Sequence, residues 1–186
     1  MGIGSPQGQS IHLYEDPSGR MLKSVPRDTS KVQRIVLHDT EETTLEQTFD
    51  KLYENHFGYH YVIDVDGEIY QFVDPRLQVA HAKGANEDSV AIAFIAGDPV
   101  DYAKRLEAHE PNLLPGEIAP ANQKQQRSAV ALMIGLHRYF PAIRYVEGHH
   151  DVEVRLTKAG QKGHSPARKT DPFQVDVAAL KEAAGL

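Results

Sequence analysis

The chain has 186 residues, of which 40% are hydrophobic and 25% are charged, a composition typical of one folded globular domain. Its 20 Lys and Arg residues against 26 Asp and Glu residues give a formal net charge of −6, which argues against nucleic acid or an anionic membrane as the main partner. The chain has no cysteine, which excludes disulfides, thiolate zinc sites and cysteine nucleophiles.

The N-terminal segment is expected to be irregular. Residues 1 to about 30 are rich in Gly, Pro, Ser and Asp, so we predict an irregular arm with at most a short strand at 11–14. Met1–Pro6 has neither the charged nor the apolar region of a signal peptide, and no apolar run approaches the roughly 20 residues of a membrane span. The main folded domain is assigned to residues 31–186.

The first regular elements follow the arm. Residues 32–38 are strongly apolar and β-branched, which predicts a buried central strand. A helix then follows, capped by Thr43 or Thr44, because apolar residues recur at helical spacing from Leu45 to Tyr53. This helix therefore has one apolar face that can cover a sheet.

A β-hairpin is predicted from two β-prone runs, 59–64 and 68–72, because the Asp66-Gly67 pair between them favours a tight turn. The apolar run 89–96 predicts a further buried strand. Residues 97 to about 120 contain four prolines and mixed charges, so we expect a long connection there with no more than one helical turn.

The C-terminal part adds helices and one strand. A long amphipathic helix is expected from Ala121 to Phe140, followed by a short strand at 145–147. Residues 152–168 predict a polar, basic loop, and residues 175–180 belong to a closing helix. Strands and helices mingle around a hairpin, so the predicted fold class is α/β, with a mixed central β-sheet flanked by helices in a single domain. Nothing in the pattern indicates the oligomeric state.

Ten histidines raise the question of which side chains converge. His38 ends a buried strand, and His149 and His150 follow another strand end. Together with Asp171, which follows the basic loop, these histidines could supply two imidazoles and one carboxylate as zinc ligands. Three protein ligands leave zinc an open position for water, as catalytic zinc sites require. Spacing alone does not establish this site, because a lone histidine at a strand end is more often structural and the chain has no compact HExxH pair.

Five segments carry a more specific signal than any single residue. They are IVLHDT at 35–40, GYHYVI with DGEIY at 58–70, HA with Asn86 and SVAI at 81–92, GHHDV at 148–152, and RKTDP at 168–172. In this order, over about residues 32 to 173, they resemble the type 2 N-acetylmuramoyl-L-alanine amidases. That family includes phage T7 lysozyme, the AmpD amidases and the peptidoglycan recognition proteins, and the resemblance implies their single-domain fold.

By this resemblance, a zinc ion is held by His38, His149 and Asp171, with His150 as the nearest rival of His149. Asp151, two residues after His149, is implied to orient that ligand. Two neutral imidazoles and one carboxylate leave a net positive charge on the zinc site, which lowers the pKa of a bound water towards neutrality.

The resemblance also implies a catalytic pair and two substrate contacts. Lys169 lies two residues before Asp171, so its ammonium can stabilise the oxyanion, and Tyr59 positions the attacking water or helps to deprotonate it. His81 and Asn86 are implied to bind the muramic acid or the stem peptide. For His81, a structural role in the turn is the alternative.

Three features depart from the family pattern. Ala93 stands where AmpD-type amidases carry a glutamate, so the site resembles the members that rely on tyrosine. Lys83 replaces the glycine of the family's HAG turn. The stretch Val154–His164 makes the spacing from His149 to Asp171 longer than in the family, and it either rims the substrate groove or forms a solvated surface loop.

The implied function of the domain at 31–186 is that of a zinc-dependent amidase. It would hydrolyse the amide bond between the lactyl group of muramic acid and L-alanine in peptidoglycan. The alternative is a non-catalytic module that binds peptidoglycan, as family members that lack a zinc ligand do. Action on the cell wall implies a periplasmic or extracellular location, and a phage endolysin, an antimicrobial effector, and a recycling or remodelling enzyme would all share this sequence pattern.

Overall fold

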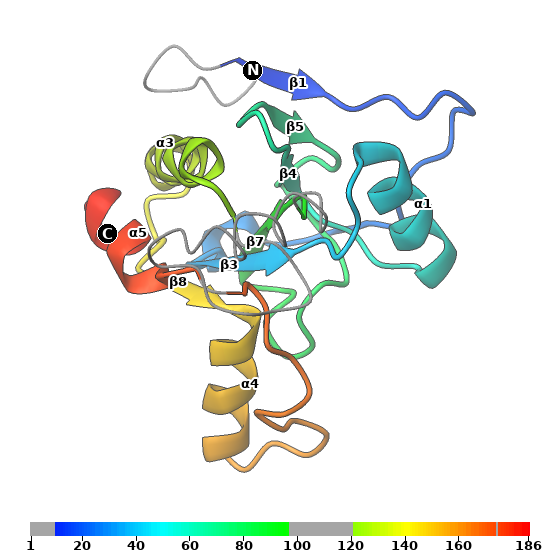
Figure 1. Cartoon of the computed structure of the whole chain (residues 1–186). Helices are drawn as coiled ribbons and strands as arrows, with labels where there is room; N and C mark the ends of the chain where they lie inside the picture. The colour runs from blue at the N-terminus through cyan, green and yellow to red at the C-terminus, as the bar shows by residue number, and fades with distance from the viewer. Residues whose placement is uncertain (1–9, 97–120, 174) are drawn as a thin grey trace, which may run out of the picture.

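A six-stranded β-sheet forms the centre of the fold, and helices lie against both of its faces (Figure 1). The computed structural model describes residues 10–96, 121–173 and 175–186. From one edge to the other, the strands are β1 (Ile11–Leu13), β5 (Ile69–Gln71), β4 (Tyr61–Ile63), β7 (Ser89–Phe94), β3 (Arg34–Asp39) and β8 (Tyr145–Gly148). Within this sheet the β4–β5 hairpin is antiparallel and the other pairs are parallel, so the predicted α/β class with a mixed sheet is confirmed. A separate antiparallel pair is formed by β2 (Val25–Pro26) and β6 (Leu77–Gln78).

Side chains cap the first turn of several helices. The bounds of the described helices are α1 (Leu45–Asn55), α3 (Gln123–Tyr139), α4 (His149–Lys158) and α5 (Val177–Ala183). Of the two threonines predicted to cap α1, Thr44 does so by accepting a hydrogen bond from the Gln47 N–H. Asn122 and Gln125 form a capping box at the start of α3. In the described ranges, no helix combines the length and the apolar character that crossing a membrane requires.

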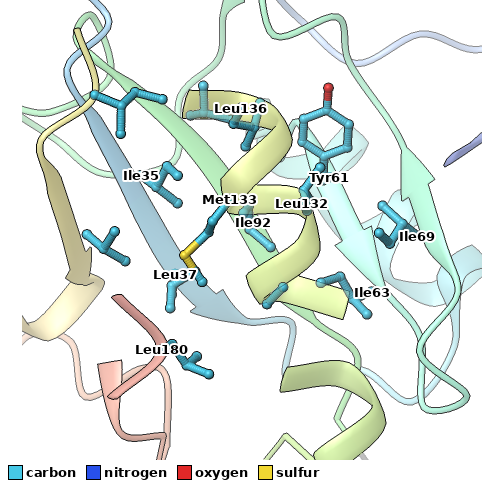
Figure 2. Packing of buried hydrophobic residues seen from close by; sticks show 14 of the residues in the cluster. Ile35, Leu37, Tyr61, Ile63, Ile69, Ile92, Leu132, Met133, Leu136 and Leu180 are labelled. Carbon is cyan, nitrogen blue, oxygen red and sulfur yellow. The ribbon is translucent and has the colours of Figure 1, made fainter. Parts of the chain in front are cut away.

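Alternation along the strands gives the sheet two different faces. Ile35 and Leu37 of β3 are fully buried in the main core cluster, where Leu132 and Met133 of α3 pack against the sheet (Figure 2). Burial of each such side chain contributes about 1.5–3 kcal/mol to stability. His38 alternates with them and points to the opposite face, which is therefore the face that can carry chemistry.

Small side chains line this opposite face on β7. Ser89, Ala91 and Ala93 are fully buried and alternate with the large residues of the core. The strand register places Ala93 opposite His38, and the N–H of Ala91 donates to the ring of His60. The small volume of these β7 residues leaves space for buried imidazole rings.

The predicted basic loop at 152–168 is wrong in its first part, which belongs to helix α4. Val152 and Leu156 lie one turn apart and pack against Val36 of β3. The sequence concealed this helix because only these two apolar residues mark its buried face among many charged ones. Residues 159–168 contain no helix or strand and form the remaining loop.

The predicted N-terminal arm packs on the domain through short elements. β1 runs parallel to β5, and Tyr14 and Leu22 lie in the apolar cluster that α1 covers. A short 3-10 turn at Thr29–Lys31 leads into β3. The division of the chain at residue 30 stays a prediction, and the first part of the arm (1–9) and the predicted connection at 97–120 lie outside the described residues.

Candidate metal centre and active site

Three side chains from distant parts of the chain converge at one edge of the sheet. β3, β7 and β8 run parallel, so their carboxyl ends lie together. His38 stands one residue before the end of β3, His149 begins α4 directly after β8, and Asp171 returns to the same place from the segment before α5. His38 and His149 are 1% and 3% exposed. One donor atom from each of these three residues lies within 4.8 Å of the others.

Each imidazole lies close to one oxygen of the Asp171 carboxylate, at about the spacing of two ligands around one metal ion. His38 Nδ1 lies 3.0 Å from Asp171 Oδ2, and His149 Nδ1 lies 3.4 Å from Asp171 Oδ1. Tetrahedral zinc ligands at roughly 2.0–2.1 Å from the metal stand about 3.3 Å apart. Burial lowers the pKa of His38. Burial alone would raise the pKa of Asp171, but the adjacent His149 and His38 rings outweigh it and hold this pKa below its usual range. A neutral imidazole and an ionised carboxylate are donors that zinc accepts.

The two adjacent histidines at the start of α4 face different partners. His149 Nδ1 faces Asp171, whereas His150 Nδ1 lies 2.8 Å from the carbonyl oxygen of Lys169. Because a carbonyl only accepts, His150 donates this hydrogen bond. The N–H of His150 also donates to the carbonyl of Asp171 at 3.0 Å. The geometry therefore favours His149 as the metal ligand and gives His150 the task of holding the segment 169–171.

Asp151 acts on the backbone before the ligand. Its Oδ2 accepts a hydrogen bond from the N–H of Gly148 at 2.8 Å, which closes the first turn of α4. A Cβ on Gly148 would lie 2.9 Å from Cδ of Pro172, so a glycine is required for the strand end to approach the segment that carries Asp171. Asp151 thereby fixes the first turn of the helix that begins with His149, and its orienting role towards a metal ligand stays a prediction.

Tyr59 stands two residues before β4, with its ring centroid 5.0 Å from that of His38. Burial and the nearby carboxylate of Asp171 raise the pKa of Tyr59 well above its usual range, so the hydroxyl keeps its proton and can donate a hydrogen bond. Of the two roles predicted for Tyr59, this favours positioning a water over deprotonating it. Ala93, buried opposite His38, offers only a methyl group at the position where a glutamate was missing.

Two depressions, of about 180 and 300 Å³, flank the converging side chains. Phe57, Tyr59 and Lys169 line both of them, so these residues lie at the boundary between the two. Phe57 is 53% exposed and adds an apolar surface beside a polar centre. Lys169 can therefore reach a substrate that spans the two depressions.

The two depressions differ in charge. Three acidic residues (Asp39, Glu41 and Asp171) and Lys51 line the smaller one. Lys83 and Arg168 line the larger one, which has no acidic residue among its described lining residues. Because the whole chain is acidic, this cationic wall is a local feature. Asp39 and Arg168 were not singled out from the sequence. Asp39 directly follows the predicted strand 32–38, and Arg168 lies in a loop rich in basic residues.

The turn before β7 holds His81 and Asn86 through internal hydrogen bonds. Asn86 Oδ1 accepts from the N–H of His81 at 3.0 Å and from that of Ala82 at 2.8 Å. The ring of His81 lies between His38 and Ser89, and each of its nitrogens is 3.0 Å from one of them. Both His81 and Asn86 line the larger depression. With both ring nitrogens occupied, the geometry favours the structural alternative for His81 over substrate binding.

Glu153 of α4 is fully buried and holds the loop 159–168. Its carboxylate accepts hydrogen bonds from the N–H of Ser165 at 3.1 Å and from Nε of Arg168 at 3.0 Å, and lies 3.2 Å from Nδ1 of His164. All of the loop except His164 is exposed, and Arg168 at its end also lines the larger depression. No residue of Val154–His164 lines either depression: its first part belongs to α4, and 159–163 are exposed, as the surface-loop alternative predicted.

Several solved structures share this fold. N-acetylmuramoyl-L-alanine amidase LysC from Clostridium intestinale is 19% identical, with a TM-score of 0.64 over 95% of this chain and 98% of that one. An AmpD derivative is 17% identical, with a TM-score of 0.59 over 98% and 99% of the two chains. The Drosophila peptidoglycan recognition protein SA is 19% identical, with a TM-score of 0.53 over 76% and 82%.

A family model adds evidence from the sequence itself. No curated protein sequence matches the chain. The model described as N-acetylmuramoyl-L-alanine amidase (Amidase_2) matches residues 28–174, which is most of the chain and includes all three converging side chains. The chain therefore belongs to the type 2 N-acetylmuramoyl-L-alanine amidase family.

Proposed function

We propose that this protein is a zinc-dependent amidase that hydrolyses the bond between the lactyl group of N-acetylmuramic acid and L-alanine in peptidoglycan. The observation that carries the proposal is the convergence of His38, His149 and Asp171 beside Lys169 and Tyr59. Family membership supports the substrate class, and the donor type, charge and spacing of the three side chains support zinc.

Each residue of the site has a separate task in this proposal. A zinc ion bound by the three ligands would supply Lewis acidity and lower the pKa of a water molecule. Lys169 places its positive charge at the boundary of the two depressions, where it stabilises the oxyanion formed when the amide carbonyl is attacked. Tyr59 keeps its proton and donates a hydrogen bond that orients the reacting groups.

The larger depression suits the peptide part of the substrate. Stem peptides carry free carboxylates, and Lys83 and Arg168 present cations to that side of the centre. Arg168 is itself held by the buried Glu153, so its guanidinium is fixed in place. The glycan part would then occupy the smaller depression beside Phe57.

The second candidate function is binding of peptidoglycan without turnover. The Drosophila peptidoglycan recognition protein SA shares the fold of this chain, which supports this second candidate. The complete set of His38, His149 and Asp171, with Lys169 at the rim, supports catalysis instead.

Incubation with purified sacculi separates the two candidates. The amidase should release new amino termini, stop when a chelator removes the metal, and resume when zinc is restored. His149→Ala should be inactive, and His150→Ala is its matched control, because the ligand set stays intact. Pelleting with sacculi without release would identify a binding module, and undiminished release by His149→Ala would overturn zinc dependence.

A further inference from the structure

A relay of hydrogen bonds connects His38 to the backbone of the turn before β7. Nε2 of His38 lies 3.0 Å from Nδ1 of His81, and Nε2 of His81 lies 3.0 Å from Oγ of Ser89. The Ser89 hydroxyl in turn donates to the carbonyl oxygen of Ala85. His38 is 1% exposed and Ser89 is fully buried, so both ends of the relay are shielded from solvent.

The carbonyl at the end of the relay fixes the direction of each hydrogen bond. Ala85 can only accept, so the single hydroxyl proton of Ser89 points to it. Ser89 Oγ then accepts from the Nε2–H of His81, which leaves a lone pair on His81 Nδ1. That lone pair accepts from the Nε2–H of His38, so the Nδ1 of a neutral His38 presents its lone pair beside the Asp171 carboxylate oxygen 3.0 Å away, an arrangement that needs a cation between the two atoms. The reverse direction would leave the Ser89 oxygen against the Ala85 carbonyl with no hydrogen between them.

The neighbouring histidine does not compete for this relay. The ring centroid of His60 lies 6.1 Å from that of His81. Nδ1 of His60 accepts from the N–H of Ala91 at 2.9 Å, so its Nε2 carries the proton and donates to the carbonyl of Leu77 at 2.9 Å. Both ring nitrogens of His60 are occupied, and His81 is therefore paired with His38 alone on that side.

We propose that His81 and Ser89 are positioning residues that hold His38 in the tautomer whose Nδ1 binds zinc. This inference rests on the proposed function, because it concerns the metal placed there. Partners of this kind fix the orientation and the tautomer of a ligating histidine and tune its affinity for the metal. His149 provides a contrast, since its Nε2 is buried without a partner in the described part of the chain.

Zinc affinity, measured by competition with a chromogenic chelator on the full chain, tests the relay. Ser89→Ala and His81→Leu should weaken zinc binding roughly 10–100-fold. His81→Asn keeps an acceptor oxygen near the position of Nδ1 and should recover part of this loss. Ser128→Ala is the matched control, because its buried hydroxyl also donates to a carbonyl, that of Gly67, outside the relay.

Long-range ¹H–¹⁵N spectra of the metal-free protein at neutral pH report the tautomer directly. His38 should be protonated at Nε2 in the parent protein and should populate both tautomers in Ser89→Ala. A parent protein in which His38 is protonated at Nδ1 but not at Nε2 would overturn the relay, as would zinc affinities of Ser89→Ala and His81→Leu equal to that of Ser128→Ala. If the parent protein binds no zinc, the proposed function fails, and the tautomer of His38 still decides whether the relay exists.

Discussion

His150 Nδ1 donates to the carbonyl oxygen of Lys169 at 2.8 Å, so the second residue of α4 holds the segment that carries the proposed catalytic lysine. Consecutive helical residues point about 100° apart, because the helix has 3.6 residues per turn. His149 therefore faces Asp171 while His150 faces the backbone two residues earlier. The first two residues of α4 thus have different tasks: His149 is a proposed metal ligand, and His150 anchors the segment 169–171.

The two histidines should respond differently to substitution. His149→Ala should lose bound zinc and turnover, because it removes one of only three protein ligands. His150→Ala should keep zinc and turn over more slowly, since only the anchoring of the segment 169–171 is weakened. Metal analysis and initial rates on both variants check this. Zinc lost from His150→Ala and kept by His149→Ala would reverse the assignment.

Loss of Tyr59 or Lys169 should impair chemistry without releasing zinc. Lys169→Ala removes a charge aimed at the oxyanion, which typically costs roughly 10²–10³ in rate. Tyr59→Phe removes the hydroxyl and keeps the ring that packs beside His38, so a smaller loss of kcat is expected. Zinc content, affinity for wall fragments and kcat should be measured together. A kcat near that of the parent protein in both variants would remove them from the mechanism.

His60 should make stability depend on pH. Burial lowers its pKa to about 3 from 6.5. Above pH 6.5 His60 is neutral in both the folded and the unfolded chain, so its burial does not lower the free energy of unfolding. Below it the unfolded chain binds a proton that the folded chain excludes, and the free energy of unfolding falls by about 1.4 kcal/mol per pH unit. Urea unfolding of the metal-free protein at several pH values between 7 and 5 should give His60→Asn a smaller slope, and equal slopes would contradict this.

Glu153 should control the order of the loop 159–168. Glu153→Gln places an amide group where a buried carboxylate accepts from Ser165 and Arg168, so we expect a loss of roughly 1–3 kcal/mol. Hydrogen exchange in the loop should become faster while zinc remains bound. Glu54→Gln, at an exposed position of α1, is the control. Unchanged exchange and stability in Glu153→Gln would show that its hydrogen bonds do not hold the loop.

The strands of the central sheet and most of the helices were predictable because their patterns are local, whereas the short pair β2–β6 was not predicted. Residues 35–37 and 90–94 are apolar throughout, and each run lies in a central parallel strand. The helix α4 was missed because its only buried apolar residues are Val152 and Leu156, and their contact with Val36 exists only after folding.

The candidate site was predictable only as far as its motifs extend. His38 and Asp171 are separated by 133 positions, and resemblance to a family, rather than spacing, connected them. The relay through Ser89 has no local signal, because a serine in an apolar strand gains its role only when the turn places His81 against it. The position of Arg168 beside the larger depression also has no local signal, because it depends on a hydrogen bond to the buried Glu153.

Mass spectrometry of the products from purified muropeptides, with zinc content measured on the same sample, tests the central claim most directly. The zinc-loaded protein should release intact stem peptides with a free L-alanine amino group and glycans with a free lactyl carboxylate. Chelation should stop this release, and added zinc should restore it. Cleavage at any other bond, or the same products from metal-free protein, would contradict a zinc-dependent N-acetylmuramoyl-L-alanine amidase.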